Sequence, residues 1–164
     1  MTPRSPRQPR RSALAAAIAL ALLAGLAACG SKGEGTGGGA DTARGVVAAH
    51  VAASQRYDLA ATCNLFTPAK RAEMAAFDGT DAEGYCERAT RSAVEDAPAA
   101  TKARSRKLYT DATIAEADRA PGTWFRVTSA DGSYHEDVQV VRAEGRWWLG
   151  QVESDLDEAG DTGH

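Results

Sequence analysis

The chain has 164 residues, of which 43% are hydrophobic and 25% are charged, with 19 basic residues against 22 acidic ones. Residues 1–28 hold four of the arginines and no acidic residue, so the remainder carries 15 basic and 22 acidic residues, a net charge of −7. This length excludes a two-domain enzyme, a TIM barrel and a full dinucleotide-binding fold. The negative charge disfavours nucleic acid as a partner.

The first 28 residues have the layout of a secretory signal peptide. Arginines at positions 4, 7, 10 and 11 precede an uncharged apolar run, Ala13 to Leu23, and small residues follow up to Cys29. The uncharged stretch from Ala13 to Ala28 is 16 residues long, shorter than the roughly 17–25 residues of a membrane-spanning helix. We therefore expect residues 1–28 to be removed after export rather than retained as a span.

The last residues of this segment, Leu26-Ala27-Ala28-Cys29, resemble the lipobox of bacterial lipoproteins. The resemblance implies that Cys29 becomes the lipidated N-terminus of the mature protein, anchored on the extracytoplasmic face of the cell membrane. Two acyl chains on one residue meet the requirement for stable anchoring. The export route stays open between the general secretory and twin-arginine pathways, because the residues after Arg10-Arg11 match the twin-arginine motif poorly.

Residues 29–40 are expected to form a tether behind the lipidated cysteine. The segment from Gly30 to Ala40 contains six glycines and no large apolar residue. Such a chain is flexible and spans about 18 Å on average.

The next part of the chain has helical periodicity. Val47, His50 and Val51 share one face of a first helix that is capped by Asp41 or Thr42 and runs to about Arg56. We expect His50 to be a semi-buried structural residue rather than a ligand. The further helices predicted from caps, proline and periodicity are Leu59 to Phe66, Thr67-Pro68 to about Phe77, and about Ala82 to Val94.

Cys63 and Cys86 remain as an even pair if Cys29 carries lipid. In an oxidising compartment we expect them to form a disulfide that joins the second predicted helix to the fourth.

After a loop at Ala97 to Ala103, the pattern changes to strands. The strands predicted are Arg104–Tyr109, Ala112–Asp118, Thr123–Ala130, Tyr134–Ala143 and Arg146–Val152, with tight turns at Asp131-Gly132-Ser133 and Glu144-Gly145. Four cations begin this region: Lys102, Arg104, Arg106 and Lys107. We expect them to protect an edge strand, the alternative being contact with an anionic wall polymer. The acidic tail, residues 153–164, is predicted to be solvated and disordered.

Helices followed by an antiparallel meander indicate an α+β domain over residues 41–152. This order resembles the NTF2-like (ketosteroid-isomerase-like) family, both in Ala48 to Asp58 with the helix that follows and in the closing hairpin, Glu144-Gly145-Arg146-Trp147-Trp148. The resemblance implies a cone in which N-terminal helices pack on a curved antiparallel sheet. In that family the cone can hold a small apolar ligand, and some members are enzymes with an acidic residue or a His–Asp pair inside it. A cystatin-like sheet on one helix is the nearest rival.

Alternation along the fourth predicted strand separates two faces. Tyr134, Glu136 and the valines at 138 and 140 take the expected interior, whereas His135 and Asp137 point outward. We expect the Glu136 carboxylate to face water at the rim of the sheet. The alternative is a buried general base with a raised pKa.

The sequence gives weaker indications of function for several other residues. His135 and Asp137 are only two potential metal ligands, and we expect neither a metal nor another cofactor. Trp147 and Trp148 must point to opposite faces, one to the core and the other to a covered rim or an exposed anchor. With Tyr57, Tyr134 and Glu136, they form the candidate pocket or partner-contact residues.

The sequence thus predicts a lipid-anchored, extracytoplasmic module that binds an envelope protein or a small apolar ligand, without catalysis. The alternative is a ketosteroid-isomerase-like enzyme that acts on a small apolar substrate with Glu136 or Asp58 as base. A third hypothesis is regulation of a neighbouring envelope protein.

Overall fold

The structure is a computed structural model, and it describes residues 38–155. The predicted signal peptide, the lipobox with Cys29, the tether up to residue 37 and the tail from residue 156 lie outside the described residues.

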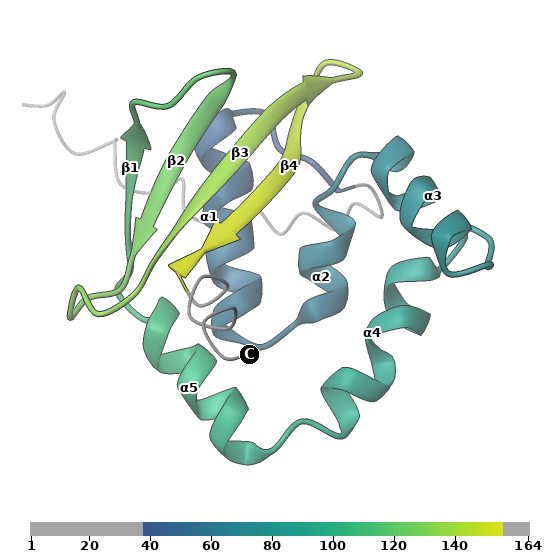
Figure 1. Cartoon of the computed structure of the whole chain (residues 1–164), viewed down its shortest axis with the longest axis horizontal. Coiled ribbons are helices and arrows are strands. Elements are labelled where there is room, and N and C mark those ends of the chain that lie inside the picture. Colours follow the sequence, from purple (N-terminus) through teal and green to yellow (C-terminus); the bar gives the residue numbers. More distant parts are fainter. Residues whose placement is uncertain (1–37, 156–164) are drawn as a thin grey trace, which may run out of the picture. The chain divides into compact units, whose positions relative to one another are not determined.

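Within the described residues, five helices precede the sheet (Figure 1). They are α1 (Ala43–Gln55), α2 (Leu59–Asn64), α3 (Pro68–Phe77), α4 (Tyr85–Glu95) and α5 (Ala99–Tyr109). The first three begin where side-chain caps predict: Thr42, Asp58 and Thr67 each accept a hydrogen bond from the backbone amide three residues ahead. The fourth begins at Tyr85, three residues later than the predicted start at about Ala82, and follows Gly84 in the left-handed conformation.

The predicted strand Arg104–Tyr109 is wrong, because these residues belong to α5. The segment Ala99–Tyr109 is made largely of alanine, lysine, arginine and leucine, which favour helix over strand. Ser105 and Tyr109, one helical turn apart, contact the rest of the fold: the Ser105 hydroxyl donates to the Ser54 carbonyl, and Tyr109 packs against the core. The four cations therefore lie on or beside an exposed helical surface, and the edge-strand role fails.

The described residues after α5 form a four-stranded antiparallel sheet in the order β1-β2-β3-β4. Its strands are β1 (Thr113–Ala117), β2 (Thr123–Thr128), β3 (His135–Ala143) and β4 (Arg146–Ser154). The turn between β3 and β4 places both Glu144 and Gly145 at positive φ, as the predicted tight hairpin requires. The α+β class is confirmed, with one strand fewer than predicted among the described residues.

Both predicted ends of the domain change. Glu153 and Ser154 continue β4 and pair with β3, so the tail is ordered for these residues. At the other end, Ala40 exchanges backbone hydrogen bonds with Trp147, so the last residues of the predicted tether extend the β4 edge. Hydrogen-bonded pairing at an edge needs no apolar side chain, and composition therefore did not reveal it.

Helix α1 lies across one face of the sheet and contacts all four strands (Figure 1). Its Val46 and Val47 pack against inward-facing residues of β2, β3 and β4 to make the main core, which consists of Val46, Val47, Phe125, Val127, Val138, Val140 and Leu149. A second, smaller core surrounds the Cys63–Cys86 disulfide, which ties α2 to α4 as predicted.

Within residues 38–155, no helix has the length and apolar character needed to cross a membrane.

Candidate functional site

Glu136 lies in the interior, between the sheet and α1. It comes from β3 on the same face as the core residues Val138 and Val140, as alternation predicts, and only 2% of its surface is exposed. The predicted solvated rim position is therefore wrong. The carboxylate is buried partly because Tyr109 of α5 and Tyr134 contact it, and α5 was not foreseen as a helix.

Three side chains meet the Glu136 carboxylate. The His50 Nε2 atom of α1 lies 2.8 Å from Oε1. The hydroxyls of Tyr109 and Tyr134 donate to Oε2 over 2.8 and 2.9 Å. Each carboxylate oxygen thus has at least one partner, as a buried charge requires. We call these four residues, His50, Tyr109, Tyr134 and Glu136, the buried carboxylate cluster.

Electrostatics favour the ionised carboxylate. Burial by itself raises the pKa of Glu136, but the hydrogen bonds from His50, Tyr109 and Tyr134 and the attraction of His50 outweigh burial and lower it. Burial and the nearby Glu136 charge raise the pKa of Tyr109, and they raise the pKa of Tyr134 to about 12. Both hydroxyls consequently stay protonated and donate at neutral pH.

The buried carboxylate cluster lines none of four hollows on the described surface. Four hollows of about 280 to 440 Å³ are lined by other residues, and none of these four includes a member of the buried carboxylate cluster. His50 Nδ1 is buried without a hydrogen-bond partner among the described residues.

The tryptophan pair is largely covered. Trp147 is half-buried and packs on the main core. Trp148 points to the opposite face, as predicted, yet only 4% of its surface is exposed. Gly38 and Gly39 lie so close to its indole ring that a Cβ at either position would meet it within 3.2 Å. The indole Nε1 donates to the Ala143 carbonyl, so Trp148 is a covered rim residue in this structure.

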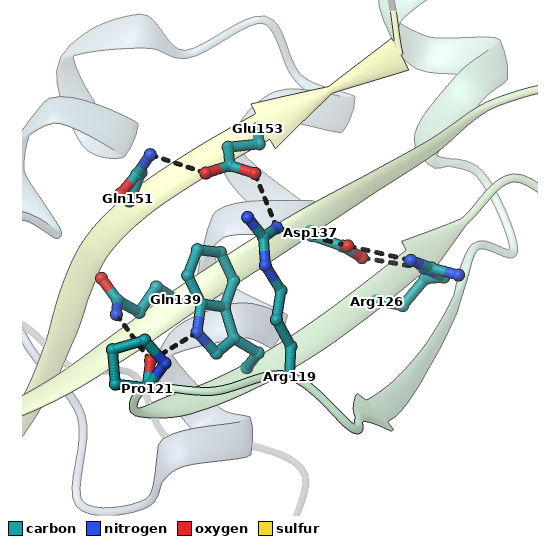
Figure 2. Close-up of polar contacts among 8 residues, drawn as sticks. Arg119, Pro121, Arg126, Asp137, Gln139, Gln151 and Glu153 are labelled. Carbon is teal, nitrogen blue, oxygen red and sulfur yellow. Dashed lines mark hydrogen bonds and ion pairs between the residues drawn. The ribbon is translucent and has the colours of Figure 1, made fainter.

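The outer face of the sheet carries an ionic network (Figure 2). Arg126 makes two hydrogen bonds to Asp137, and Arg119 reaches both Asp137 and Glu153, over 3.6 and 2.6 Å. The hydrogen bond from Arg126 and the charge of both arginines lower the pKa of Asp137 although partial burial opposes this. His135 faces Asp155 instead, with Nδ1 2.7 Å from Oδ2. Asp137 is thus committed to arginines rather than to a shared site with His135.

Tyr57 and Asp58 lie at the corner between α1 and α2. Tyr57 is half-buried and lines a hollow of about 430 Å³ between this corner and α4. Asp58 caps α2, where its carboxylate accepts from the Ala61 amide, and its side chain is 45% exposed. Asp58 therefore lies in a solvated position and does not join Glu136.

Sequence reasoning missed Tyr109 and the pairing of His50 with Glu136. The sequence did contain a signal for this pairing. His50 lies on the apolar face of the first predicted helix, and Glu136 lies on the apolar face of the fourth predicted strand. Burying an unpaired ionisable group costs free energy. Two such residues on surfaces that pack together are therefore expected to pair with each other. Tyr109 could not be found this way, since its helix was expected to be a strand.

Among residues 38–155 no group of three or more histidine, cysteine, aspartate or glutamate side chains is arranged to hold a metal ion. Comparison of the chain with protein-family models, curated proteins and solved structures finds no significant match. We therefore infer function from the sequence motifs and from the geometry of the side chains.

Proposed function

We propose that this protein is a bacterial lipoprotein, held by a lipid on Cys29 at the extracytoplasmic face of the cell membrane. Its domain is NTF2-like and acts as a binding or protein-interaction module rather than as an enzyme.

The Cys63–Cys86 disulfide is the observation that carries this proposal. It pairs two of the three cysteines within the domain and leaves Cys29, at the end of the export-type segment, as the remaining one. Structural disulfides persist in oxidising compartments and are rare in reducing ones. A bonded pair beyond a signal-like segment supports an exported domain with one sulfur left for a lipid.

The order of elements supports an NTF2-like domain. Helices come first and an antiparallel sheet follows, and α1 contacts all four strands, which is consistent with the helix-on-sheet packing that the family resemblance implies. The buried carboxylate cluster occupies the region between α1 and β3, where family members hold ligands or catalytic groups.

The state of Glu136 supports binding over catalysis. A general base needs a pKa near the working pH and access to a substrate proton. Glu136 already accepts hydrogen bonds at both oxygens, and its pKa is lowered rather than raised. Such a carboxylate organises the interior of the domain.

One observation favours the ketosteroid-isomerase-like alternative: a histidine and a carboxylate lie within the helix-covered side of the sheet, with two tyrosine hydroxyls beside them. The assay that separates the two functions is incubation of the purified chain with a β,γ-unsaturated ketosteroid, with detection of the conjugated product. Turnover that Glu136→Gln abolishes would favour the enzyme. Our proposal expects no turnover above that of this variant.

Membrane fractionation of Cys29→Ser tests the anchor. The unaltered protein should sediment with membranes and resist extraction by high salt, because acyl chains rather than charges hold it. The Cys29→Ser variant should appear in the soluble fraction, whereas a neighbouring control, Ser31→Ala, should behave like the unaltered protein. A Cys29→Ser protein that sediments as fully as the control would refute the lipid anchor.

A further inference from the structure

A second candidate site lies away from the buried carboxylate cluster, in the hollow of about 430 Å³ between the α1–α2 corner and α4. We call it the α4 hollow. One wall comes from Arg56 and Tyr57, just after α1, and from the start of α2. The other wall comes from α4, between Glu87 and Glu95. The Cys63–Cys86 disulfide joins α2 to α4, so the two walls are covalently tied. Its volume lies within the range of small-molecule sites.

Some charged groups of the α4 hollow have hydrogen-bond or ion-pair partners, and others do not. Glu87 accepts a hydrogen bond from Asn64, and Asp58 caps α2. Arg56 has only a long contact of 4.0 Å with Asp58, and its side chain is 62% exposed. Arg91 and Glu95, one turn apart on α4, make no ion pair or side-chain hydrogen bond within residues 38–155. One cation and one anion therefore stand free on the same wall.

The apolar part of the α4 hollow comes from Tyr57, Val94 and Ala60. Tyr57 has a φ of 57°, in the left-handed region, at a position just after a helix where glycine is the unstrained choice. The side chain of Tyr57 lines this hollow, and its hydroxyl group has no hydrogen-bond partner within residues 38–155. Strain of this kind collects where a side chain is needed for binding.

We propose that the α4 hollow binds a short peptide with free termini, the apolar side chain of which packs against Tyr57 and Val94. The peptide carboxylate pairs with Arg91, assisted by Arg56, and its ammonium group pairs with Glu95. The lining holds two arginines and three acids, so neither a plain anion nor a plain cation is matched, whereas a zwitterion meets a partner at each end. This inference rests on the proposed binding function and names its ligand class.

Calorimetric titration of the purified full chain in detergent tests the inference. The probes are the dipeptide alanyl-phenylalanine with free termini, its N-acetylated form and its C-terminal amide. The free dipeptide should bind most tightly, and loss of either terminal charge should weaken binding about tenfold.

Two exposed variants then assign each charge. Arg91→Gln should weaken binding of the free and N-acetylated dipeptides about tenfold and leave the amide unaffected. Glu95→Gln should weaken the free dipeptide and the amide and leave the N-acetylated form unaffected. Arg104→Gln, on the exposed surface of α5, is the matched control and should change nothing.

The inference is overturned if no probe binds in the millimolar range, or if all three bind equally and the variants make no difference. Cys29 plays no part in this titration. A protein that leaves the membrane on Cys29→Ser substitution but fails to bind dipeptides would keep the anchor and lose only the α4 hollow.

Discussion

At the residue scale, Glu136 is the side chain on which the interior of the domain depends. It is a carboxylate with 2% exposure, and three neighbours from α1, α5 and the start of β3 compensate for its burial. A hydrogen bond to a charged group contributes about 1.5–3 kcal/mol, more than one between neutral groups. The cluster links the first helix, α1, and the last helix, α5, to the sheet. Its loss should therefore lower the stability of the whole domain.

Replacement Glu136→Gln should lower the free energy of unfolding at neutral pH by about 2–4 kcal/mol, because an amide offers only one acceptor oxygen to three donors. Urea denaturation followed by tryptophan fluorescence measures this change. Glu116→Gln, at an exposed position of β1, is the control and should stay within about 0.5 kcal/mol of the unaltered protein. Equal stability of both variants would show that the cluster contributes nothing.

The difference in the free energy of unfolding between the unaltered protein and Glu136→Gln should depend on pH. The pKa of Glu136 is lowered in the folded state from its ordinary value of 4.5, so the unfolded state binds more protons in acid. Its contribution is therefore fully present above pH 4.5 and is lost as the pH falls towards the lowered folded value. The stability difference between the unaltered protein and Glu136→Gln should shrink below pH 4.5. A difference that grows in acid would contradict the lowered pKa.

The position of a side chain could be predicted where neighbouring residues determine it, but not where a contact with a distant part of the chain determines it. Alternation, a local property, assigned Tyr134 and Glu136 to the inner face and His135 and Asp137 to the outer one, and the structure agrees. The burial of Glu136 depends on Tyr109, which is 27 positions earlier. No local pattern reports a contact of that kind, and so the rim position was expected instead.

At the element scale, the helices with explicit start signals were predicted well. Thr42 and the Thr67-Pro68 pair mark the starts of α1 and α3, because a capping oxygen and a proline satisfy or remove unpaired amides. The start of α5 has only Pro98 and no side-chain cap. Its six-residue window Arg104–Tyr109 is too short for a helical period to outweigh apparent alternation.

The disulfide links α2 covalently to α4. Because Tyr85 and Cys86 are the buried residues of α4, we expect this link to be important for holding α4 in place. It closes a loop with a sequence separation of 23, for which the chain-entropy relation gives about 3 kcal/mol. The double variant Cys63→Ala/Cys86→Ala should lose about that much stability in urea denaturation. The unaltered protein with reductant should match it, and reductant should not affect the variant further. An unchanged unfolding midpoint would contradict the role of the bridge.

At the scale of the whole molecule, the proposed function divides the chain at Cys29. The basic and apolar residues of the predicted export segment precede it, and the chain beyond residue 28 carries 15 basic and 22 acidic residues. This excess of negative charge is not attracted to anionic lipid head groups. We therefore propose that acyl chains attach the protein to the membrane, while the Cys63–Cys86 disulfide stabilises the folded part.

The central claim is that one sulfur carries lipid and the other two are joined. Intact mass spectrometry of the protein isolated from its native membranes, alkylated without prior reduction, tests both parts in one measurement. The predicted result is a chain that begins at Cys29, carries a diacylglyceryl group and takes up no alkylating reagent. A chain that begins at Met1 with three alkylated cysteines would contradict the account.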